Sequence, residues 1–145
     1  MQRERGRAMR DNVEVLVDSD AFVGWIYPAD AHYDRVRSIF QKIRQARLRM
    51  ITNSWVVAET ATVLSHRSGQ VAARSFLSRL RELDFPIIHI DESLQEDAIQ
   101  IFEHQDKKGT SMVDCGNVAV MRRFDIFRIF SFDRFYKNQL NTELL

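Results

Sequence analysis

Hydrophobic residues fall along the chain in two alternating patterns, short continuous runs and longer stripes at helical spacing. Continuous apolar runs at 13–17, 49–52, 87–90 and 126–132 predict four buried strands. Between the runs, apolar residues recur at helical spacing, which predicts helices over 20–26, 31–43, 55–67, 71–83, 93–102 and 111–123. Apolar strands separated by helices indicate an α/β fold with a mostly parallel sheet.

Polar residues mark where several of these helices begin. Asp30 is positioned to cap the second helix, and Asn53 or Ser54 the third. Two segments, 93–96 and 111–114, have the Ser-x-x-acid spacing of a capping box, which predicts a helix start at each.

The composition fits one globular domain of ordinary size. The 145 residues are 45% hydrophobic with only 5 Gly and 2 Pro, which excludes a disordered or linker-dominated chain. The single cysteine excludes a disulfide framework and a multi-cysteine zinc cluster. Residues 1–11 form a charged arm that we expect to be flexible, followed by a single domain over 12–145. With no long apolar run and no secretory leader, we expect a cytoplasmic protein without membrane contact.

The net charge of +1 comes from 21 basic and 20 acidic side chains, and by itself it argues against a polyanionic partner. The distribution of the charges changes this picture. Residues 35–49 contain six basic and no acidic side chains, whereas 91–106 contain six acidic side chains and no Lys or Arg. One interpretation is that both segments are simply solvated faces of helices. The alternative is that the basic segment faces RNA and the acidic segment lies on the opposite side. The candidate substrate contacts are Arg44, Arg47, Lys107 and Lys108.

Carboxylates follow three of the predicted strands directly, as Asp18, Asp91 and Asp133. Ligands of open parallel sheets bind outside the carboxyl ends of the strands, so these positions are candidate site residues. Each acid is also explained as the N-cap of the next helix, which suits Asp91 best because Ser93 and Glu96 lie beside it. Asp18 and Asp133 can be either site residues or N-caps, and the sequence leaves both interpretations open.

Two further acids lie where a solvated charge is not expected. Glu59 falls in a helix that is otherwise apolar or small, and Asp114 falls in the first turn of the 111–123 helix. A carboxylate among apolar neighbours is usually paired, ligated or at the mouth of a site, while Asp114 is also explained by the helix dipole. Four converging carboxylates would repel one another unless a cation neutralised them, and oxygen-only ligands select Mg²⁺ or Mn²⁺.

The same acids carry a resemblance to a known family. The chain resembles the PIN-domain family, and most closely its VapC-type toxin ribonucleases, in four segments: Val15–Phe22 (VLVDSDAF), Val57–Thr60 (VAET), Ser111–Asp114 (SMVD) and Ser131–Phe135 (SFDRF). The likeness spans residues 13–137 and fills all four acidic positions of the family in order. Ser131 matches the usual Ser or Thr of the family, whereas Asp20 stands where a small or amide residue is common.

This resemblance implies a three-layer α/β/α domain that cleaves RNA by metal-dependent hydrolysis. As direct ligands of Mg²⁺ or Mn²⁺ it implies Asp18 and Asp114. Glu59 and Asp133 would bind the metal directly or through water, with Ser131 in support. The resemblance also implies a homodimer that is held inactive by an antitoxin. An apolar groove for that antitoxin is expected among Phe22, Trp25, Ile26, Tyr27, Phe40 and Trp55.

Two alternative functions stay open. Asp18 and Asp20, following a strand, also resemble the nucleophile and the acid–base of a haloacid-dehalogenase-type phosphatase, although that reaction leaves Glu59 unexplained. The other alternative is a PIN-like module that binds RNA or a protein without cleaving it. The complete set of four acids argues against such a module.

Overall fold

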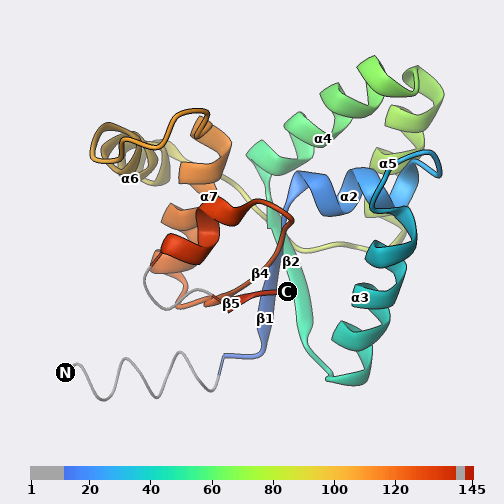
Figure 1. The fold of residues 1–145 in the computed structure, drawn as a ribbon, viewed down its shortest axis with the longest axis horizontal. Helices are drawn as coiled ribbons and strands as arrows, with labels where there is room; N and C mark the ends of the chain where they lie inside the picture. The colour runs from blue at the N-terminus through green and yellow to red at the C-terminus, as the bar shows by residue number, and fades with distance from the viewer. Residues whose placement is uncertain (1–11, 140–142) are drawn as a thin grey trace.

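The computed structural model describes residues 12–139 and 143–145, so the expected arm over 1–11 lies outside the described residues. Figure 1 shows the chain coloured from its N-terminus to its C-terminus. The strands are β1 (Glu14–Val17), β2 (Arg49–Asn53), β3 (Ile87–Ile88), β4 (Arg128–Phe130) and β5 (Glu143–Leu144). The helices are α2 (Ser19–Ile26), α3 (Tyr33–Gln45), α4 (Ser54–Arg67), α5 (Gln70–Glu82), α6 (Glu92–Glu103), α7 (Met112–Arg123) and the 3-10 helix η1 (Arg134–Asn138). Within these residues, no helix is both long and apolar enough to cross a bilayer.

The strands form one sheet in the order β3-β2-β1-β4-β5. All neighbouring pairs are parallel, with Leu16 of β1 opposite Ile51 of β2 and Ile129 of β4. The mostly parallel sheet expected from the apolar runs is therefore confirmed. The strands predicted over 87–90 and 126–132 are shorter, as β3 and β4. The pattern does not predict β5, because its two residues contain no apolar run.

Side chains of β1 alternate between two buried cores, one on each face of the sheet. Val15 and Val17 pack with residues of α2, α3, α4 and α5, whereas Leu16 packs with residues of α6 and α7. All three side chains are fully buried. Figure 1 shows α2 to α5 on one side of the sheet and α6 with α7 on the other, which confirms the three-layer α/β/α arrangement.

Two helix starts form as the sequence predicts. Oδ1 of Asn53 accepts two backbone N–H groups in the first turn of α4, each at 3.1 Å. Ser111 and Asp114 form the expected capping box at the start of α7, each side chain accepting the other's backbone N–H at 3.0 Å. These caps fix the residues at which α4 and α7 begin.

Two other helix starts differ from the predicted ones. Asp91 caps α6 as expected and accepts a first-turn N–H at 2.9 Å, but the helix begins at Glu92, one residue before the predicted capping box at 93–96. Helix α3 begins after the expected Asp30 cap, with His32 at the N-cap position and no side-chain capping bond. Asp30 instead accepts the N–H of His32 at 3.0 Å and pairs with Arg67 at 2.8 Å.

Candidate active site

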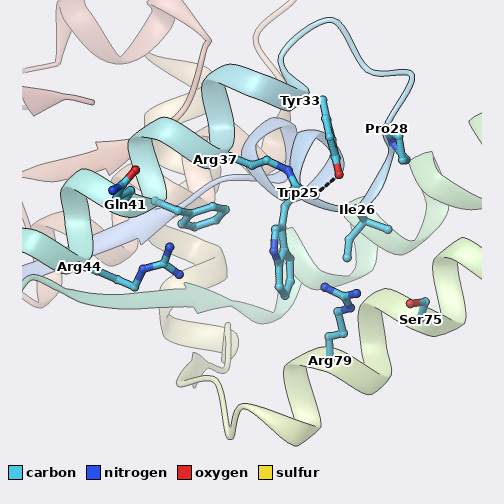
Figure 2. Close-up of a pocket in the computed structure, with 10 residues that line it drawn as sticks. Trp25, Ile26, Pro28, Tyr33, Arg37, Gln41, Arg44, Ser75 and Arg79 are labelled. Atoms are coloured by element: carbon cyan, nitrogen blue, oxygen red, sulfur yellow. Dashed lines mark hydrogen bonds between the residues drawn. The ribbon is translucent and has the colours of Figure 1, made fainter.

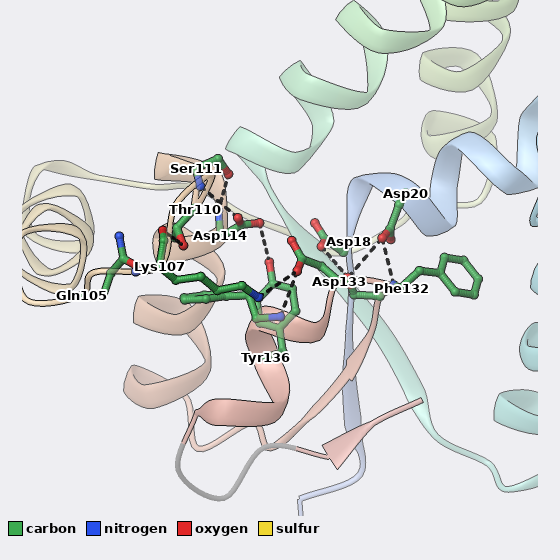
Figure 3. Close-up of polar contacts among 12 residues, drawn as sticks. Asp18, Asp20, Gln105, Lys107, Thr110, Ser111, Asp114, Phe132, Asp133 and Tyr136 are labelled. Atoms are coloured by element: carbon green, nitrogen blue, oxygen red, sulfur yellow. Dashed lines mark hydrogen bonds and ion pairs between the residues drawn. The ribbon is translucent and has the colours of Figure 1, made fainter.

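The candidate site lies where the carboxyl ends of β1 and β4 meet. The chain adds β2 and β3 on one side of β1 and then β4 on the other side, so the order reverses between β1 and β4. Ligands of open parallel sheets bind at such a reversal. Asp18 follows β1 directly, and its N–H donates to the carbonyl of Phe130 in β4 at 3.0 Å. Figure 3 shows Asp18, Asp20, Asp114 and Asp133 gathered at this edge.

The hydroxyl of Ser131 lies among three of these acids. Its Oγ is 2.8 Å from Oδ2 of Asp18 and 3.3 Å from Oδ2 of Asp20, and it accepts the N–H of Asp133 at 3.1 Å. A hydroxyl has one proton, so Asp18 and Asp20 compete for a single donor. The backbone N–H of Phe132 gives Asp20 a further donor at 2.8 Å.

Asn117 and Tyr136 connect Asp18 to Asp114. Nδ2 of Asn117 donates to Oδ1 of Asp18 at 3.0 Å and to the hydroxyl of Tyr136 at 2.9 Å. That hydroxyl donates to Oδ1 of Asp114 at 3.0 Å. Oδ1 of Asn117 accepts from Nδ2 of Asn53 at 2.7 Å, which fixes the orientation of the amide.

Sequence reasoning missed both connecting residues. Asn117 lies three residues after Asp114 in an otherwise apolar helix, and Tyr136 lies three residues after Asp133. A polar side chain one helical turn after a candidate acid is the signal that could have found them.

Three of the acids also cap helices. Asp18 accepts the N–H of Ser19 at 2.8 Å, and Asp133 accepts the N–H of Phe135 at 2.9 Å. The capping interpretation left open for Asp18 and Asp133 is therefore correct, and Asp114 takes part in the capping box whose N-cap is Ser111. A carboxylate has about four lone-pair sites, so these caps leave oxygen lone pairs for a ligand.

Glu59 lies in the second turn of α4 and is half-buried. It follows Trp55 by four residues, so both side chains share one face of the helix. The Trp55 ring lies against α7, since a Cβ at Gly116 would stand 2.5 Å from its Cε3. The face that carries Glu59 is therefore turned toward the helix that carries Asp114. Within the described residues, no hydrogen bond or ion pair joins Glu59 to the other acids.

The basic residues proposed to contact the substrate lie at two different ends of the sheet. Nζ of Lys107 is 4.0 Å from Oδ1 of Asp133, and both side chains are nearly half exposed, at 47% and 41%. Lys108 follows on the same exposed loop. Arg44 and Arg47 lie where α3 turns into the first residue of β2. Because the acids stand beyond the other end of the parallel strands, the structure does not bring these two arginines to the site.

Burial dominates the electrostatics of the site. It raises the pKa of Asp18 from 3.8 to about 7, with a further contribution from the charge of Asp20. Burial also raises the pKa of Asp20 from 3.8 to about 6. The pKa of Tyr136 is raised well above its ordinary value, by burial and then by the charges of Asp18 and Asp114, so its hydroxyl stays a donor.

The donor set fits a hard divalent cation in its chemistry. Oδ1 of Asp20 is the one buried side-chain oxygen or nitrogen in residues 12–139 and 143–145 that lacks a hydrogen-bond partner. An unpartnered buried oxygen beside a second carboxylate is the kind of environment that a cation completes. Carboxylate oxygens select Mg²⁺ or Mn²⁺ over zinc. As they stand, no three His, Cys, Asp or Glu side chains in the described residues group closely enough to hold an ion, so the acids would have to draw together around it.

A separate cavity of about 530 Å³ opens between α2, α3 and α5. Figure 2 shows the side chains that line it. Three residues of the expected apolar groove are among them: Trp25, Ile26 and Phe40. Phe22 is instead fully buried in the core. The lining also contains guanidinium groups and no carboxylate: Arg37, Arg44 and Arg79. The groove is therefore cationic as well as apolar.

Comparisons with known proteins identify the family and the fold. The PIN-domain model matches residues 15–138. A search of curated protein sequences finds no match. Among solved structures, the chain is similar to the Mycobacterium tuberculosis toxin VapC20, described as cleaving the sarcin–ricin loop, with a TM-score of 0.76 and 23% identity over 85% of this chain and 92% of that one. Because the PIN-domain match covers most of the sequence, the chain belongs to the PIN-domain family.

Proposed function

We propose that this protein is a metal-dependent endoribonuclease and the toxin of a toxin–antitoxin pair. The observation that supports this most is the pair of acids joined through Asn117 and Tyr136 at the reversal of strand order. Asp18 and Asp114 are only 3% and 9% exposed. Acids kept out of water at this position suit a cation and an anionic substrate better than a solvated surface does.

In this proposal each acid has a defined role. Asp18 and Asp114 hold Mg²⁺ or Mn²⁺ directly, and Glu59 and Asp133 contribute directly or through water. Ser131 is a positioning residue, because its hydroxyl contacts both Asp18 and Asp133. The chemistry that the metal supplies when bound is Lewis acidity toward the phosphodiester and a lower pKa of water. Water attack on the phosphorus in line with the leaving oxygen needs no covalent intermediate.

The RNA would meet cations at the rim of this site. Nζ of Lys107 lies 4.0 Å from Oδ1 of Asp133, and Lys108 follows it on the exposed loop that precedes α7. Phosphate contacts of this kind give affinity without sequence recognition and weaken with salt. Arg44 and Arg47 lie too far along the sheet for this role, and we assign Arg44 to the groove instead.

The groove between α2, α3 and α5 is our candidate for the antitoxin. Its aromatic walls suit an apolar helix or strand, and its three arginines suit carboxylates on that segment. We therefore expect the antitoxin segment that binds here to carry both acidic and bulky apolar side chains, alternating along its sequence. The resemblance also implies a homodimer, which solution scattering would test.

The function is tested by incubating the purified protein with total RNA, ribosomal RNA included, in Mn²⁺, in Mg²⁺ or in EDTA. We expect discrete cleavage products with either metal and none in EDTA. Asp18→Asn and Asp114→Asn should lower cleavage at least a hundredfold (about 3 kcal/mol in the barrier), whereas Asp125→Asn on the exposed turn between α7 and β4 should cleave as the unchanged protein does. Metal-dependent cleavage that persists in both site variants would refute the assignment.

The same experiment separates the alternatives. Metal binding or RNA binding without any cleavage would favour a non-cleaving module. Hydrolysis of phosphomonoesters but not of RNA would favour the phosphatase. The phosphatase is disfavoured because the chain belongs to the PIN-domain family and because a phosphatase of that type gives Glu59 no role.

A further inference from the structure

An aromatic stack stands beside the acids and has no role in the proposed chemistry. The imidazole of His32 lies on the ring of Phe132, with centroids 3.9 Å apart and planes 10° from parallel. Phe132 stands between Ser131 and Asp133 in the chain, and its N–H donates to Asp20 at 2.8 Å. The stack is therefore anchored on the backbone of the site.

The imidazole is not needed for the local fold. His32 occupies the N-cap position of α3, yet its side chain makes no capping bond, and the ring forms no hydrogen bond within the described residues. Both His32 and Phe132 are half-buried. Phe132 covers one face of the imidazole, and because His32 is only half-buried, part of this aromatic surface stays open to solvent.

A cation completes this surface. The exposed guanidinium group of Arg35 stands one turn after His32 on α3, with Cζ 5.3 Å from the centroid of Phe132. Residues 35–49 contain no acidic side chain. A planar ring next to a guanidinium group is a pairing that suits a nucleotide, because the base stacks on the ring and the phosphate attracts the cation.

We propose that His32 and Phe132 form a stacking subsite for the base of an unpaired nucleotide next to the cleaved phosphodiester, with Arg35 contacting the phosphate of that nucleotide. This subsite rests on the proposed function, since it assigns a substrate contact at the same edge of the sheet. It places the strand that approaches the acids along the start of α3 and makes single-stranded RNA the preferred substrate.

The test uses the full chain and a fluorescein-labelled twelve-nucleotide RNA without internal pairing. Binding is measured by fluorescence anisotropy in EDTA, so that cleavage does not intervene, and cleavage is measured separately in Mn²⁺. A second set of RNAs carries one abasic nucleotide at successive positions around the cleavage point. The protein variants are His32→Ala, His32→Tyr and Arg35→Ala, with His66→Ala and Arg74→Ala as controls on the exposed faces of α4 and α5.

We expect His32→Ala to weaken binding of the intact RNA about tenfold, as loss of one stacked base does. The same variant should bind one of the abasic RNAs as the unchanged protein binds it, because the base is then already missing. His32→Tyr should restore stacking and affinity. Arg35→Ala should weaken binding about threefold and lower its salt dependence by about one phosphate contact. The two controls should bind like the unchanged protein.

The proposal is overturned if His32→Ala, with an unchanged circular dichroism spectrum, binds the intact and abasic RNAs as the unchanged protein does. The stack would then be internal packing only. It is also overturned if the unchanged protein binds no RNA. If the protein binds RNA through His32 but never cleaves it, the subsite stands and the proposed nuclease activity fails, so the two failures are distinguishable.

Discussion

Only one of the two carboxylate oxygens of Asp20 has a hydrogen-bond donor in the structure. Its Oδ2 accepts the N–H of Phe132, while its Oδ1 is buried without a donor. Asp18 competes with it for the proton of Ser131. Two ionised carboxylates so close together and shielded from water repel strongly. Asp20 therefore destabilises the metal-free fold, and a bound cation would offset that cost.

Replacing Asp20 with Asn should show this cost directly. Removing one of two repelling buried charges should raise the free energy of unfolding of the metal-free protein by about 1–2 kcal/mol at pH 8, measured by urea denaturation. The same variant should bind Mn²⁺ more weakly by calorimetry. Asp125→Asn on the exposed turn between α7 and β4 should change stability by less than about 0.5 kcal/mol. A less stable Asp20→Asn protein would show that the charge itself holds the Phe132 segment.

Tyr136 should matter through the hydrogen bonds of its hydroxyl rather than its ring. Tyr136→Phe leaves Oδ1 of Asp114 and one N–H of Asn117 without their buried partner, which should lower the free energy of unfolding by about 1–3 kcal/mol. Because Asp114 then loses its orientation, Mn²⁺ affinity should fall as well. Tyr27→Phe is the matched control, since the structure gives the Tyr27 hydroxyl no hydrogen bond in the described residues. Equal behaviour of the two variants would exclude a positioning role for Tyr136.

At the scale of elements, the distance between α4 and α7 decides whether Glu59 can approach Asp114. The Trp55 ring sits directly over Gly116, so the absence of a side chain there sets the close approach of the two helices. Helix α7 is buried along most of its length, which leaves it little freedom to shift. The contact between Trp55 and Gly116 contains none of the acids, yet it sets how closely α4, which carries Glu59, approaches α7.

Gly116→Ala should separate the two helices. Its Cβ would lie 2.5 Å from Cε3 of Trp55, so the ring or the helix must move, at a cost of about 1–3 kcal/mol of stability. Gly24→Ala is the matched control, because its Cβ would lie 2.6 Å from Cγ2 of Val36, between α2 and α3. Both variants should melt earlier, but only Gly116→Ala should also weaken Mn²⁺ binding. Equal metal affinity in the two variants would contradict the link between this contact and the site.

The elements that the sequence predicts well are those whose signal is local. The apolar run at 13–17 and the capping box at Ser111 act within a few residues, so the pattern is enough to find them. Asn117 and Tyr136 are different, because their partners lie 99 residues away at Asp18 and 22 residues away at Asp114. Their position one turn after a candidate acid marks them as candidates, but no local pattern says which distant acid each one contacts. The placement of Arg44 and Arg47 failed for a related reason, since it depends on which end of the sheet α3 reaches.

For the whole molecule, the net charge of +1 conceals a separation of charge between layers. The basic residues of 35–49 lie on α3 and the start of β2, and the acidic residues of 91–106 lie on and around α6. These two helices pack against opposite faces of the sheet. On the α6 side, Arg123 of α7 pairs with Asp97 at 2.7 Å and with Asp91 at 3.8 Å, whereas no acidic side chain in the described residues offsets the basic residues of 35–49. A polyanion approaching the molecule is therefore favoured on the α3 side.

The buried acids should make the stability of the whole molecule depend on pH in an unusual direction. The pKa of Asp18 is about 7 and that of Asp20 about 6 in the folded protein, against 3.8 for an exposed Asp. The folded state therefore binds more protons than the unfolded state between those values, and its stability falls as pH rises. The metal-free protein should lose about 2–4 kcal/mol between pH 5 and pH 8 through these two groups.

Urea denaturation at each pH measures this loss, and Asp20→Asn serves as the reference because it removes one of the two groups. Adding Mn²⁺ at pH 8 should return most of the lost stability, since a ligand that binds only the folded state stabilises it by mass action. If the protein instead gains stability from pH 5 to pH 8 in EDTA, then Asp18 and Asp20 are already ionised at pH 5 and their charges are stabilised by neighbouring groups.

The order of the chain around the site also bears on how the protein is made. Asp18 belongs to the first strand and helix, but the hydroxyl of Ser131 that contacts it comes 113 residues later. While the ribosome is still adding α6, the growing chain has β1 and neither β4 nor η1. Asp18 and Asp20 therefore emerge from the ribosome long before Asn117 and Ser131, the side chains that contact Asp18, have been made. The acidic site cannot form until α7, β4 and η1 have been added to the chain.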